Sequence, residues 1–275
     1  MRVGYVQFEP RFGEVKRNIG RAIEMMGSER ADLWVLPELF STGYLFVSRE
    51  ELMGLAEPVP EGPTTQALLD FSCKANATVV AGLAERAGDK VYNAAVIVGP
   101  AGLIGRYRKI HLFGKEKLWF DPGDLPLEPM DLGGVKIGVM ICFDHFFPEA
   151  ARTLALRGAQ ILCHPANLVL PGMGQLSMRV RAMENRVFAV TANRIGGEAR
   201  GGKELRFTGE SQIVSPEGAV LLRASPEGEE VGVVEIDPEK ALDKRVTRYN
   251  DLFADRRPEF YGASLKMAYR KRWSR

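Results

Sequence analysis

Short apolar runs with the composition of buried strands recur along the whole chain, and segments with helical spacing separate several of them. The runs cover residues 3–8, 33–36, 78–84, 94–98, 136–141, 160–164, 188–193, 212–215 and 231–236. Between them, helical periodicity extends over 15–26, and further helices are expected to begin near Pro63 and Pro148. Because strands and helices alternate, the sequence predicts an α/β fold.

Two turns of the same type lie in the two halves of the chain. One contains Pro100 and Gly102, and the other contains Pro216 and Gly218. Proline supplies the fixed φ of a turn's second residue and glycine accepts a positive φ two positions later, so each turn is expected to join two antiparallel strands. With a helix-rich stretch before each turn, the pattern predicts two similar halves. Each half would place helices on one face of a sheet and leave the other face for packing sheet on sheet.

The length and composition are those of one ordinary globular domain. No linker-like segment divides the 275 residues, so a single domain over 1–275 is expected. Hydrophobic residues make up 45% of the chain, and no apolar stretch approaches the ~18 residues of a membrane span, so no membrane partner is expected. A net charge of +2 gives no reason to expect nucleic acid.

The N-terminus and the cysteines predict a cytoplasmic protein. The chain enters its first strand-like run at once, without the apolar core and cleavage site of a signal peptide. Cys73, Cys142 and Cys163 form an odd and sparse set without metal spacing, which favours reduced thiols over disulfides. Cys73, within a helical pattern, and Cys163, within a strand-like run, are interpreted as core residues.

Basic and aromatic residues concentrate at the C-terminus. They are Lys266, Tyr269, Arg270, Lys271, Arg272, Trp273 and Arg275. Two interpretations remain open: a solvated tail, or an arm over residues 255–275 that packs on a second subunit.

Three ionisable residues each follow a strand-like run. Cys142 comes directly after 135–141 and before the helix expected from Pro148. Glu38 follows 33–37 and Lys109 follows 104–108. Because α/β folds expose reactive groups where strands end, these three side chains are expected to share one rim.

Together the three side chains can support nucleophilic catalysis without histidine. A thiol with a free pKa of ~8.5 is mostly protonated at neutral pH and needs a base or a positive environment. Glu38 can take the proton, Lys109 can stabilise the anion formed on attack at an unsaturated carbon, and a helix N-terminus near Cys142 favours the thiolate. Against this stands the ordinary interpretation, since free cysteines are more often core residues and buried ion pairs more often structural.

The segments around these residues resemble the three signature segments of the nitrilase superfamily of carbon–nitrogen hydrolases. They are 36–40 around Glu38, 108–113 around Lys109 and 141–144 around Cys142, in the order of the family. The similarity extends to 116–124, 165–167 and 181–186 and so covers nearly the whole chain. This context favours catalytic over structural roles.

The resemblance implies a role for each residue. Glu38 would be the general base, Cys142 the nucleophile, and Lys109 the cation that holds the tetrahedral intermediate with the backbone N–H of the next residue after Cys142. Glu116 would be a second carboxylate that orients the substrate or the attacking water. The expected course is loss of ammonia or an amine, then hydrolysis of an acyl-cysteine by water that Glu38 activates. The substrate-binding residues implied are Tyr44, Phe143, His145, Phe146 and Asn167.

The residues after the nucleophile predict a neutral substrate. Family branches that take carboxylate-bearing amides carry arginine in this stretch, where the present chain has His145 and Phe146. Without a guanidinium group, a free carboxylate would be costly to desolvate among phenylalanines, unless Arg179 or Arg194 reached in from elsewhere. A small neutral aliphatic amide is therefore expected.

A nitrile is the alternative substrate, because it presents an electrophilic carbon to the same thiol and also releases ammonia. True nitrilases tend to have Trp-Glu after the cysteine, whereas Phe143 and Asp144 look more like the amidase branches. Transfer of the acyl group to another acceptor and a catalytically silent binding module remain further alternatives.

No metal and no cofactor are expected. His111, His145 and His164 are interpreted as hydrogen-bonded structural histidines, since one Cys-x-x-His pair is not a zinc spacing. By resemblance the fold would be a four-layer α-β-β-α sandwich with an internal pseudo-two-fold. The same resemblance implies a homodimer or higher homo-oligomer, with the C-terminal arm across the partner.

Overall fold

The computed structural model describes residues 1–262, which fall into two units. The first comprises Met1–Asp243, and the second begins at Lys244. The described part of the second unit contains β15 (Arg245–Thr247), β16 (Asn250–Asp251) and α7 (Pro258–Tyr261). Residues 263–275 of the expected C-terminal arm lie outside the described residues, and the arm stays a prediction.

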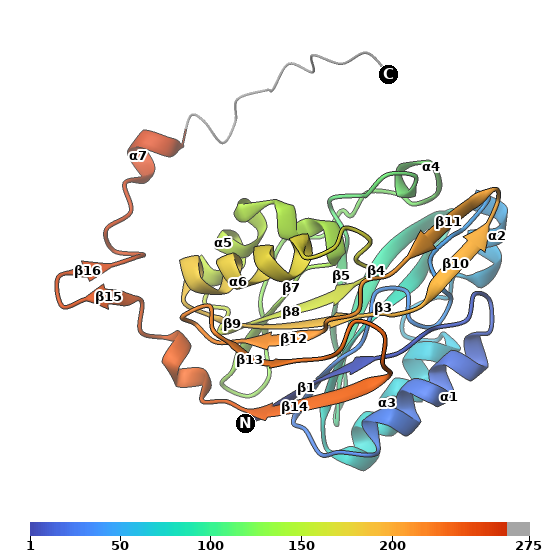
Figure 1. Ribbon diagram of the computed structural model, residues 1–275, viewed down its shortest axis with the longest axis horizontal. Helices are drawn as coiled ribbons and strands as arrows, with labels where there is room; N and C mark the ends of the chain where they lie inside the picture. Colours follow the sequence, from blue (N-terminus) through green and yellow to red (C-terminus); the bar gives the residue numbers. More distant parts are fainter. Residues whose placement is uncertain (263–275) are drawn as a thin grey trace. The chain divides into compact units, whose positions relative to one another are not determined.

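Two six-stranded sheets form the centre of the first unit (Figure 1). The first sheet has the order β14-β1-β2-β3-β4-β5 and the second has the order β13-β12-β9-β8-β7-β6. The strands of the first sheet are β1 (Arg2–Gln7), β2 (Leu33–Val35), β3 (Thr78–Ala87), β4 (Lys90–Gly99), β5 (Gly102–Arg108) and β14 (Glu230–Glu235). Those of the second are β6 (Met130–Asp131), β7 (Lys136–Val139), β8 (Ile161–Ala166), β9 (Phe188–Asn193), β12 (Gln212–Val214) and β13 (Val220–Arg223).

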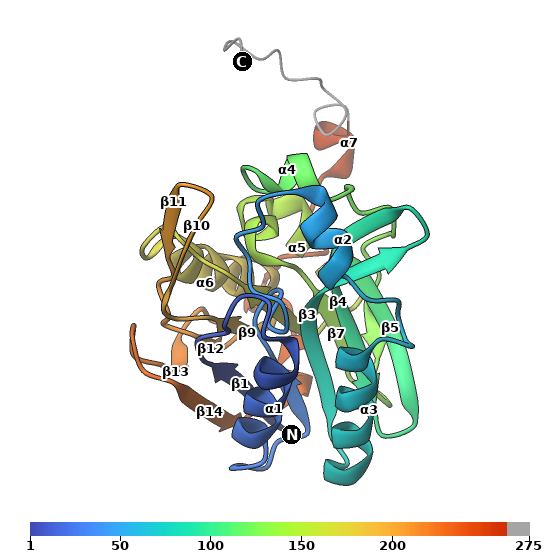
Figure 2. The same ribbon diagram turned by 90° about the vertical axis from the view of Figure 1, so that its right-hand side faces the viewer.

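Helices cover the outer faces of both sheets (Figure 2). α1 (Val15–Met26) and α3 (Pro63–Ala75) lie on the first sheet, and α5 (Pro148–Leu156) and α6 (Met173–Asn185) lie on the second. The layers are therefore α-β-β-α, as predicted. The remaining elements are α2 (Arg49–Leu55), α4 (Glu116–Trp119), the 3-10 helices η1 (Cys142–Phe146) and η2 (Pro238–Ala241), and the hairpin of β10 (Gly197–Arg200) and β11 (Lys203–Arg206).

Alternate residues of the strands divide between two apolar cores. In β2 and just after it, Leu33 and Val35 pack between the sheets, whereas Trp34 and Leu36 pack on the side of α1 and α3. Successive side chains of a strand point to opposite faces, so an apolar run buried on both faces fills both cores at once. This explains why the strand-like runs are continuous rather than alternating.

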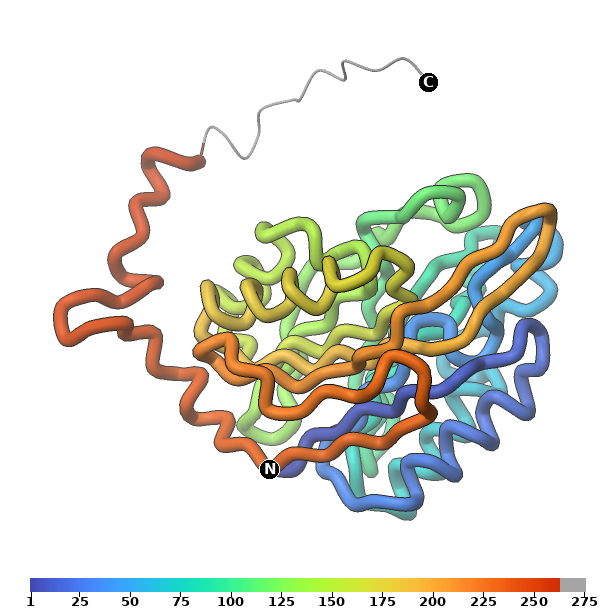
Figure 3. The backbone as a smooth tube through the Cα atoms, in the orientation of Figure 1, coloured from blue at the N-terminus to red at the C-terminus, as the bar shows by residue number. Residues whose placement is uncertain are grey.

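The two sheets repeat one strand pattern, which agrees with the prediction of two similar halves. Three parallel strands, β1 to β3 in one sheet and β7 to β9 in the other, are followed by an antiparallel pair. The turns at Pro100 and Pro216 join these pairs, β4 to β5 and β12 to β13. An antiparallel strand completes the other edge of each sheet, β14 beside β1 in the first and β6 beside β7 in the second. Figure 3 shows β14, which comes late in the first unit, beside β1.

The structure corrects two details of the sequence analysis. Cys73 is exposed and not a core residue, because the buried face of α3 runs through Leu68 and Ser72, four residues apart, and the next position turns toward solvent. Cys163 is buried, as predicted. The run 136–141 ends as a strand at Val139. Among residues 1–262, no helix combines the length and the apolar character needed to cross a bilayer.

Candidate active site

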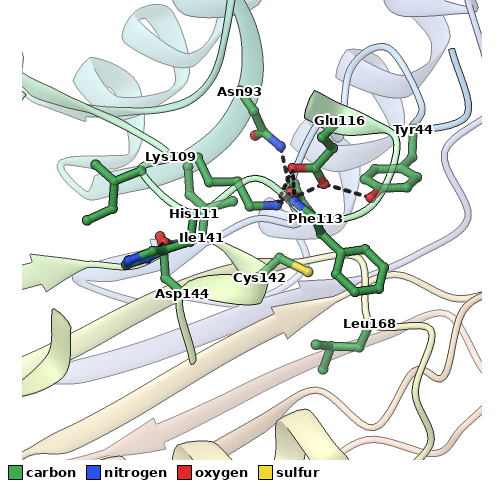
Figure 4. A network of polar contacts seen from close by, with 12 residues as sticks. Tyr44, Asn93, Lys109, His111, Phe113, Glu116, Ile141, Cys142, Asp144 and Leu168 are labelled. Carbon is green, nitrogen blue, oxygen red and sulfur yellow. Dashed lines mark hydrogen bonds and ion pairs between the residues drawn. The ribbon is translucent and has the colours of Figure 1, made fainter. Parts of the chain in front are cut away.

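The structure brings the three predicted strand-end residues together, although they come from different sheets. Glu38 follows β2 and Lys109 follows β5 in the first sheet, whereas Cys142 begins η1 after β7 in the second. Glu116, the predicted second carboxylate, is the first residue of α4. Figure 4 shows the side chains of Lys109 and Glu116 converging above Cys142.

Lys109 is the centre of a buried polar cluster. Its Nζ donates to Oε1 of Glu38 at 2.7 Å and to Oε1 of Glu116 at 2.9 Å. Asn93 donates through Nδ2 to the same Oε1 of Glu38 at 2.7 Å, and the Tyr44 hydroxyl donates to Oε1 of Glu116 at 2.6 Å. Lys109 and Glu38 are 1% and 0% exposed. A charged cluster removed from water to this degree keeps its geometry only if its members are paired, and here they are.

The cluster holds two carboxylates against one ammonium group. Burial raises the pKa of Glu38, Lys109 opposes the rise, and Glu116 adds to it. Burial disfavours the charge on Lys109, but Glu116 and Glu38 outweigh this and raise its pKa. Lys109 therefore stays charged, while Glu38 is a stronger base than an exposed glutamate.

The thiol of Cys142 is protonated in the resting protein. Burial raises its pKa well above the ordinary value and the charge of Glu38 raises it further, while Lys109 and the backbone N–H of Asn167 act in the opposite direction. The expected support for a thiolate from a helix N-terminus is thus outweighed. A base must remove the proton, and Oε2 of Glu38 is a buried oxygen with no hydrogen-bond partner in the described part of the chain.

Two turns with unusual backbone geometry place the base and the thiol. Leu39, directly after Glu38, has φ +50°, and Cys142 itself has φ +41°. Residues other than glycine rarely adopt this left-handed region, and such strain gathers at functional sites. Gly82 of β3 allows the turn at Glu38 to approach closely, since a Cβ at this position would lie 2.5 Å from the Cα of Glu38.

The predicted substrate-binding residues divide between two adjoining cavities. A narrow pocket of about 20 Å³ contains Cys142 together with Phe143, His145, Phe146 and Asn167. A larger cavity of about 160 Å³ shares Phe113 and Val169 with it and is lined by further residues, including Tyr44, Phe46, Glu116, Trp119 and Leu205. The volume of the narrow pocket at the thiol is close to the ~10–15 Å³ that one water molecule needs. The neighbouring cavity is large enough for a longer part of a substrate.

The histidines are hydrogen-bonded, as the sequence analysis expected. His164 contacts the carbonyl of Cys142 through Nε2 at 3.0 Å, and His145 contacts the Ser177 hydroxyl through Nδ1 at 2.8 Å. Burial lowers the pKa of His145 to about 3 and that of His164 to about 4, so both are neutral at pH 7. Because a carbonyl only accepts, Nε2 of His164 carries its proton.

Sequence reasoning missed three residues of the site. Asn93 donates to Glu38, while the Tyr107 hydroxyl donates to Asp144 at 2.8 Å. Their positions offered a faint signal, because Tyr107 and Asp144 lie two residues from Lys109 and Cys142 respectively. Within residues 1–262, no three His, Cys, Asp or Glu side chains are grouped as a metal site requires.

Comparisons with known proteins agree with this geometry. The family model for carbon–nitrogen hydrolases matches residues 2–245. The chain is 52% identical over 264 residues to a nitrilase from Pyrococcus abyssi, covering 95% of this chain and 99% of that protein. It is also similar to a solved carbon–nitrogen hydrolase from Helicobacter pylori, with 28% identity, a TM-score of 0.87 and coverage of 97% and 98%.

A second solved structure to which the chain is similar has a covalently modified cysteine in its active site. It is a mutant of the amidase from Nesterenkonia sp. AN1, in which acrylamide has undergone Michael addition at the active-site cysteine. The TM-score is 0.79 at 25% identity, with coverage of 96% of this chain and 99% of that one. The family model matches residues 2–245, and the identity to one relative is high across nearly its full length. These two findings show membership of a family and not only a shared fold. The chain therefore belongs to the carbon–nitrogen hydrolase family of the nitrilase superfamily and is a hydrolase of carbon–nitrogen bonds other than peptide bonds.

Proposed function

We propose that the protein hydrolyses small, neutral aliphatic amides through an acyl intermediate on Cys142. The observation that carries the proposal is that the charge of a buried carboxylate, Glu38, raises the pKa of the protonated thiol, while the second oxygen of this carboxylate has no partner among the described residues. The raised pKa of Glu38 suits a general base, because proton transfer is most effective when the pKa of the base approaches the working pH.

The reaction would begin when Glu38 removes the thiol proton and the sulfur attacks the amide carbon. Charge then develops on the substrate oxygen, where the Lys109 ammonium group stabilises it. The N–H of Phe143 is a second donor, because it lies in the first turn of η1, where N–H groups lack intrahelical partners. Glu38 returns its proton to the leaving nitrogen, ammonia departs, and an acyl-cysteine remains.

The second half would use the same residues. Glu38 takes a proton from water, the hydroxide attacks the thioester carbon, and the C–S bond breaks as the carboxylic acid forms and Glu38 returns its proton to the sulfur of Cys142. Glu116 accepts from Lys109, from the Tyr44 hydroxyl and from the backbone N–H of Phe113, so its carboxylate is fixed beside the ammonium group. It thereby keeps Lys109 charged through both halves.

Two features of the surroundings of Cys142 support a neutral amide, since the narrow pocket at the thiol has no lysine or arginine among its described lining residues. Neither arginine considered as a carboxylate partner lines the cavities: Arg194 pairs with Glu198 and donates to the carbonyl of Pro10, and Arg179 donates to the carbonyl of Gly218. Asn167 is 2% exposed, and no partner for its side-chain nitrogen or oxygen lies within the described residues. Its side-chain amide offers an NH2 group as donor and a carbonyl oxygen as acceptor, which match the oxygen and the N–H of a primary amide.

A nitrile is the second candidate substrate, favoured by the similarity of the chain to the nitrilase from Pyrococcus abyssi. The thiol would add to the nitrile carbon to give a thioimidate, and water would then release ammonia and the acid by way of the same acyl-cysteine. A nitrile nitrogen accepts a hydrogen bond but donates none, so it leaves the oxygen of Asn167 unpartnered. This difference places the amide first.

The test is ammonia release from propionamide, butyramide, malononitrile and fumaronitrile, with succinamate as the charged match of butyramide. We expect turnover of a neutral substrate, a kcat/KM for succinamate at least about 10-fold below that for butyramide, and no turnover by Cys142→Ala. Intact-mass detection of the acyl adduct identifies the group transferred, and added hydroxylamine measures any transfer to acceptors other than water. Full activity in Cys142→Ala, or a preference for succinamate, would contradict the proposal.

A further inference from the structure

Asp144 is a fully buried carboxylate that accepts three hydrogen bonds next to the nucleophile. Oδ2 accepts from the backbone N–H of Ile141 and from the Tyr107 hydroxyl, each at 2.8 Å, and Oδ1 lies 2.7 Å from Nδ1 of His111. A carboxylate only accepts, so Nδ1 of His111 carries the proton. Figure 4 shows Asp144 and His111 beside Cys142, on the side away from Phe113.

The donors to Asp144 come from both of the segments that carry the reaction. Tyr107 and His111 lie two residues before and two residues after Lys109, whereas Ile141 directly precedes Cys142. The Tyr107 hydroxyl stays protonated, since burial and the neighbouring Asp144 raise its pKa well above the ordinary value. One carboxylate thus joins the end of β5 in the first sheet to the turn after β7 in the second.

The turn that Asp144 holds is strained. Cys142 has φ +41°, a conformation that is unfavourable for a residue other than glycine and persists only where its surroundings impose it. Hydrogen bonds hold the backbone on both sides of Cys142. Asp144 accepts from the N–H of Ile141, and His164 donates to the carbonyl of Cys142. The stacking of the His111 ring on Phe147, at 3.6 Å between centroids, holds the third donor in place.

We propose that Asp144 and Tyr107 are positioning residues that fix the distance between the Cys142 thiol and the cluster of Lys109, Glu38 and Glu116. Among residues 1–262, no strand of one sheet is hydrogen-bonded to a strand of the other, so backbone pairing does not set this distance. The inference rests on the proposed role of Cys142 as the nucleophile. Neither residue takes part in bond breaking, and each acts only through the placement of Cys142 and Lys109.

The decisive variant is Tyr107→Phe, which removes one hydroxyl and leaves the ring. Its matched control is Tyr92→Phe on the neighbouring strand β4, where the hydroxyl donates to the carboxylate of Asp124 at 2.9 Å. We expect Tyr107→Phe to lower kcat by about 10- to 100-fold with KM changed less than about threefold, because a misplacement of ~1 Å can cost ~100-fold. Tyr92→Phe is expected to keep kcat within about twofold.

A second readout follows the thiol without turnover. Iodoacetamide labelling, resolved by peptide mass, reports Cys142 and the exposed Cys73 in the same sample. Labelling of Cys142 is expected to slow in Tyr107→Phe in parallel with kcat, while Cys73 labels at the wild-type rate. Asp144→Asn, which retains an acceptor but turns an amide donor toward Tyr107 or His111, is expected to show the same two effects more strongly.

The outcomes separate this inference from the proposed function. If Tyr107→Phe only lowers the melting temperature, with kcat and Cys142 labelling unchanged, Asp144 is structural and the inference is overturned. A rise in KM alone would overturn it too, since that would indicate a role in substrate binding. If Cys142→Ala retains activity, the proposed function fails instead.

Discussion

Glu38 shows how much of the site is decided at the level of single residues. Its type and its position after a strand could be predicted from the sequence, because carboxylate, ammonium and thiol groups recur at three strand ends. Its protonation behaviour could not, because it depends on burial, on Lys109 and on Glu116, which lies 78 residues away in the sequence. The same holds for Cys142, where the expected benefit of a helix N-terminus is smaller than the effect of burial.

Glu38→Gln is expected to lower kcat by about 100- to 10,000-fold, the range typical for loss of a general base. Glutamine keeps the shape and can accept from Lys109 but cannot take the thiol proton. The matched control is Glu57→Gln, a buried carboxylate that accepts from the N–H groups of Thr64 and Thr65 at the start of α3. Steady-state kinetics should show normal kcat for Glu57→Gln, and equal losses in both variants would argue against a general base at Glu38.

The buried histidines predict a pH dependence of stability. Because the pKa is about 3 for His145 and about 4 for His164, below the ~6.5 of a free histidine, the unfolded chain binds protons first as the pH falls. Their contribution to the free energy of unfolding is complete above about pH 6.5 and is lost toward about pH 4, at ~1.4 kcal/mol per pH unit for each histidine. Urea denaturation at pH 7, 6 and 5 should show this fall in the free energy of unfolding. In His164→Gln the fall per pH unit should be smaller by the contribution of one histidine. An unchanged slope in that variant would contradict the burial effect.

At the scale of elements, helices were predicted better than the ends of strands. Periodicity placed α1 at 15–26 as observed, because one face of that helix is buried and the other is wet. The strands are buried on both faces, so periodicity could not mark where β7 ends. The β10–β11 hairpin was missed altogether, although Glu198 from it accepts from the backbone N–H groups of Tyr44 and Leu45 and so fixes a wall of the cavity.

Gly82→Ala is expected to lower activity because the turn carrying Glu38 lies against β3. An added Cβ would meet the backbone of Pro37, Glu38 and Leu39 within 2.9 Å, and backbone cannot give way as a side chain can. We expect a fall in kcat of about 10-fold or more together with a lower melting temperature. Gly20→Ala is the control: Gly20 lies on the exposed face of α1, a Cβ there would meet nothing within 4 Å, and the substitution should raise stability by up to ~1 kcal/mol. Normal kcat in Gly82→Ala would show that the turn tolerates displacement.

At the scale of the whole molecule, the homodimer stays a proposal. It is supported by exposed apolar side chains on the helices that cover the second sheet: Leu156 of α5, and Leu176 and Met183 of α6, are 41%, 61% and 50% exposed. Apolar side chains grouped on neighbouring helices are typical of surfaces that another subunit covers. A homodimer formed about a two-fold axis would use the same surface on both copies.

Sedimentation at micromolar concentration is expected to give about twice the 30.4 kDa of one chain. Leu176→Glu is expected to give the single-chain mass, because a charge would be buried in the interface. Leu242→Glu, equally exposed at 62% but in the loop after η2, is the control and should remain a dimer. A monomeric wild type would remove the dimer proposal and the packing of the C-terminal arm with it.

The sequence by itself determined the α/β class and the two similar halves, and it predicted which residues serve as the base, the cation and the nucleophile. These follow from local patterns, because strand burial, turn geometry and signature segments are properties of neighbours in the chain. Only the tertiary structure decided that the thiol rests protonated, that Gly82 makes room for Glu38, and that Asp144 joins the segments of Lys109 and Cys142. These depend on burial and on contacts between the two sheets, and no local pattern records a distance across 35 residues of chain.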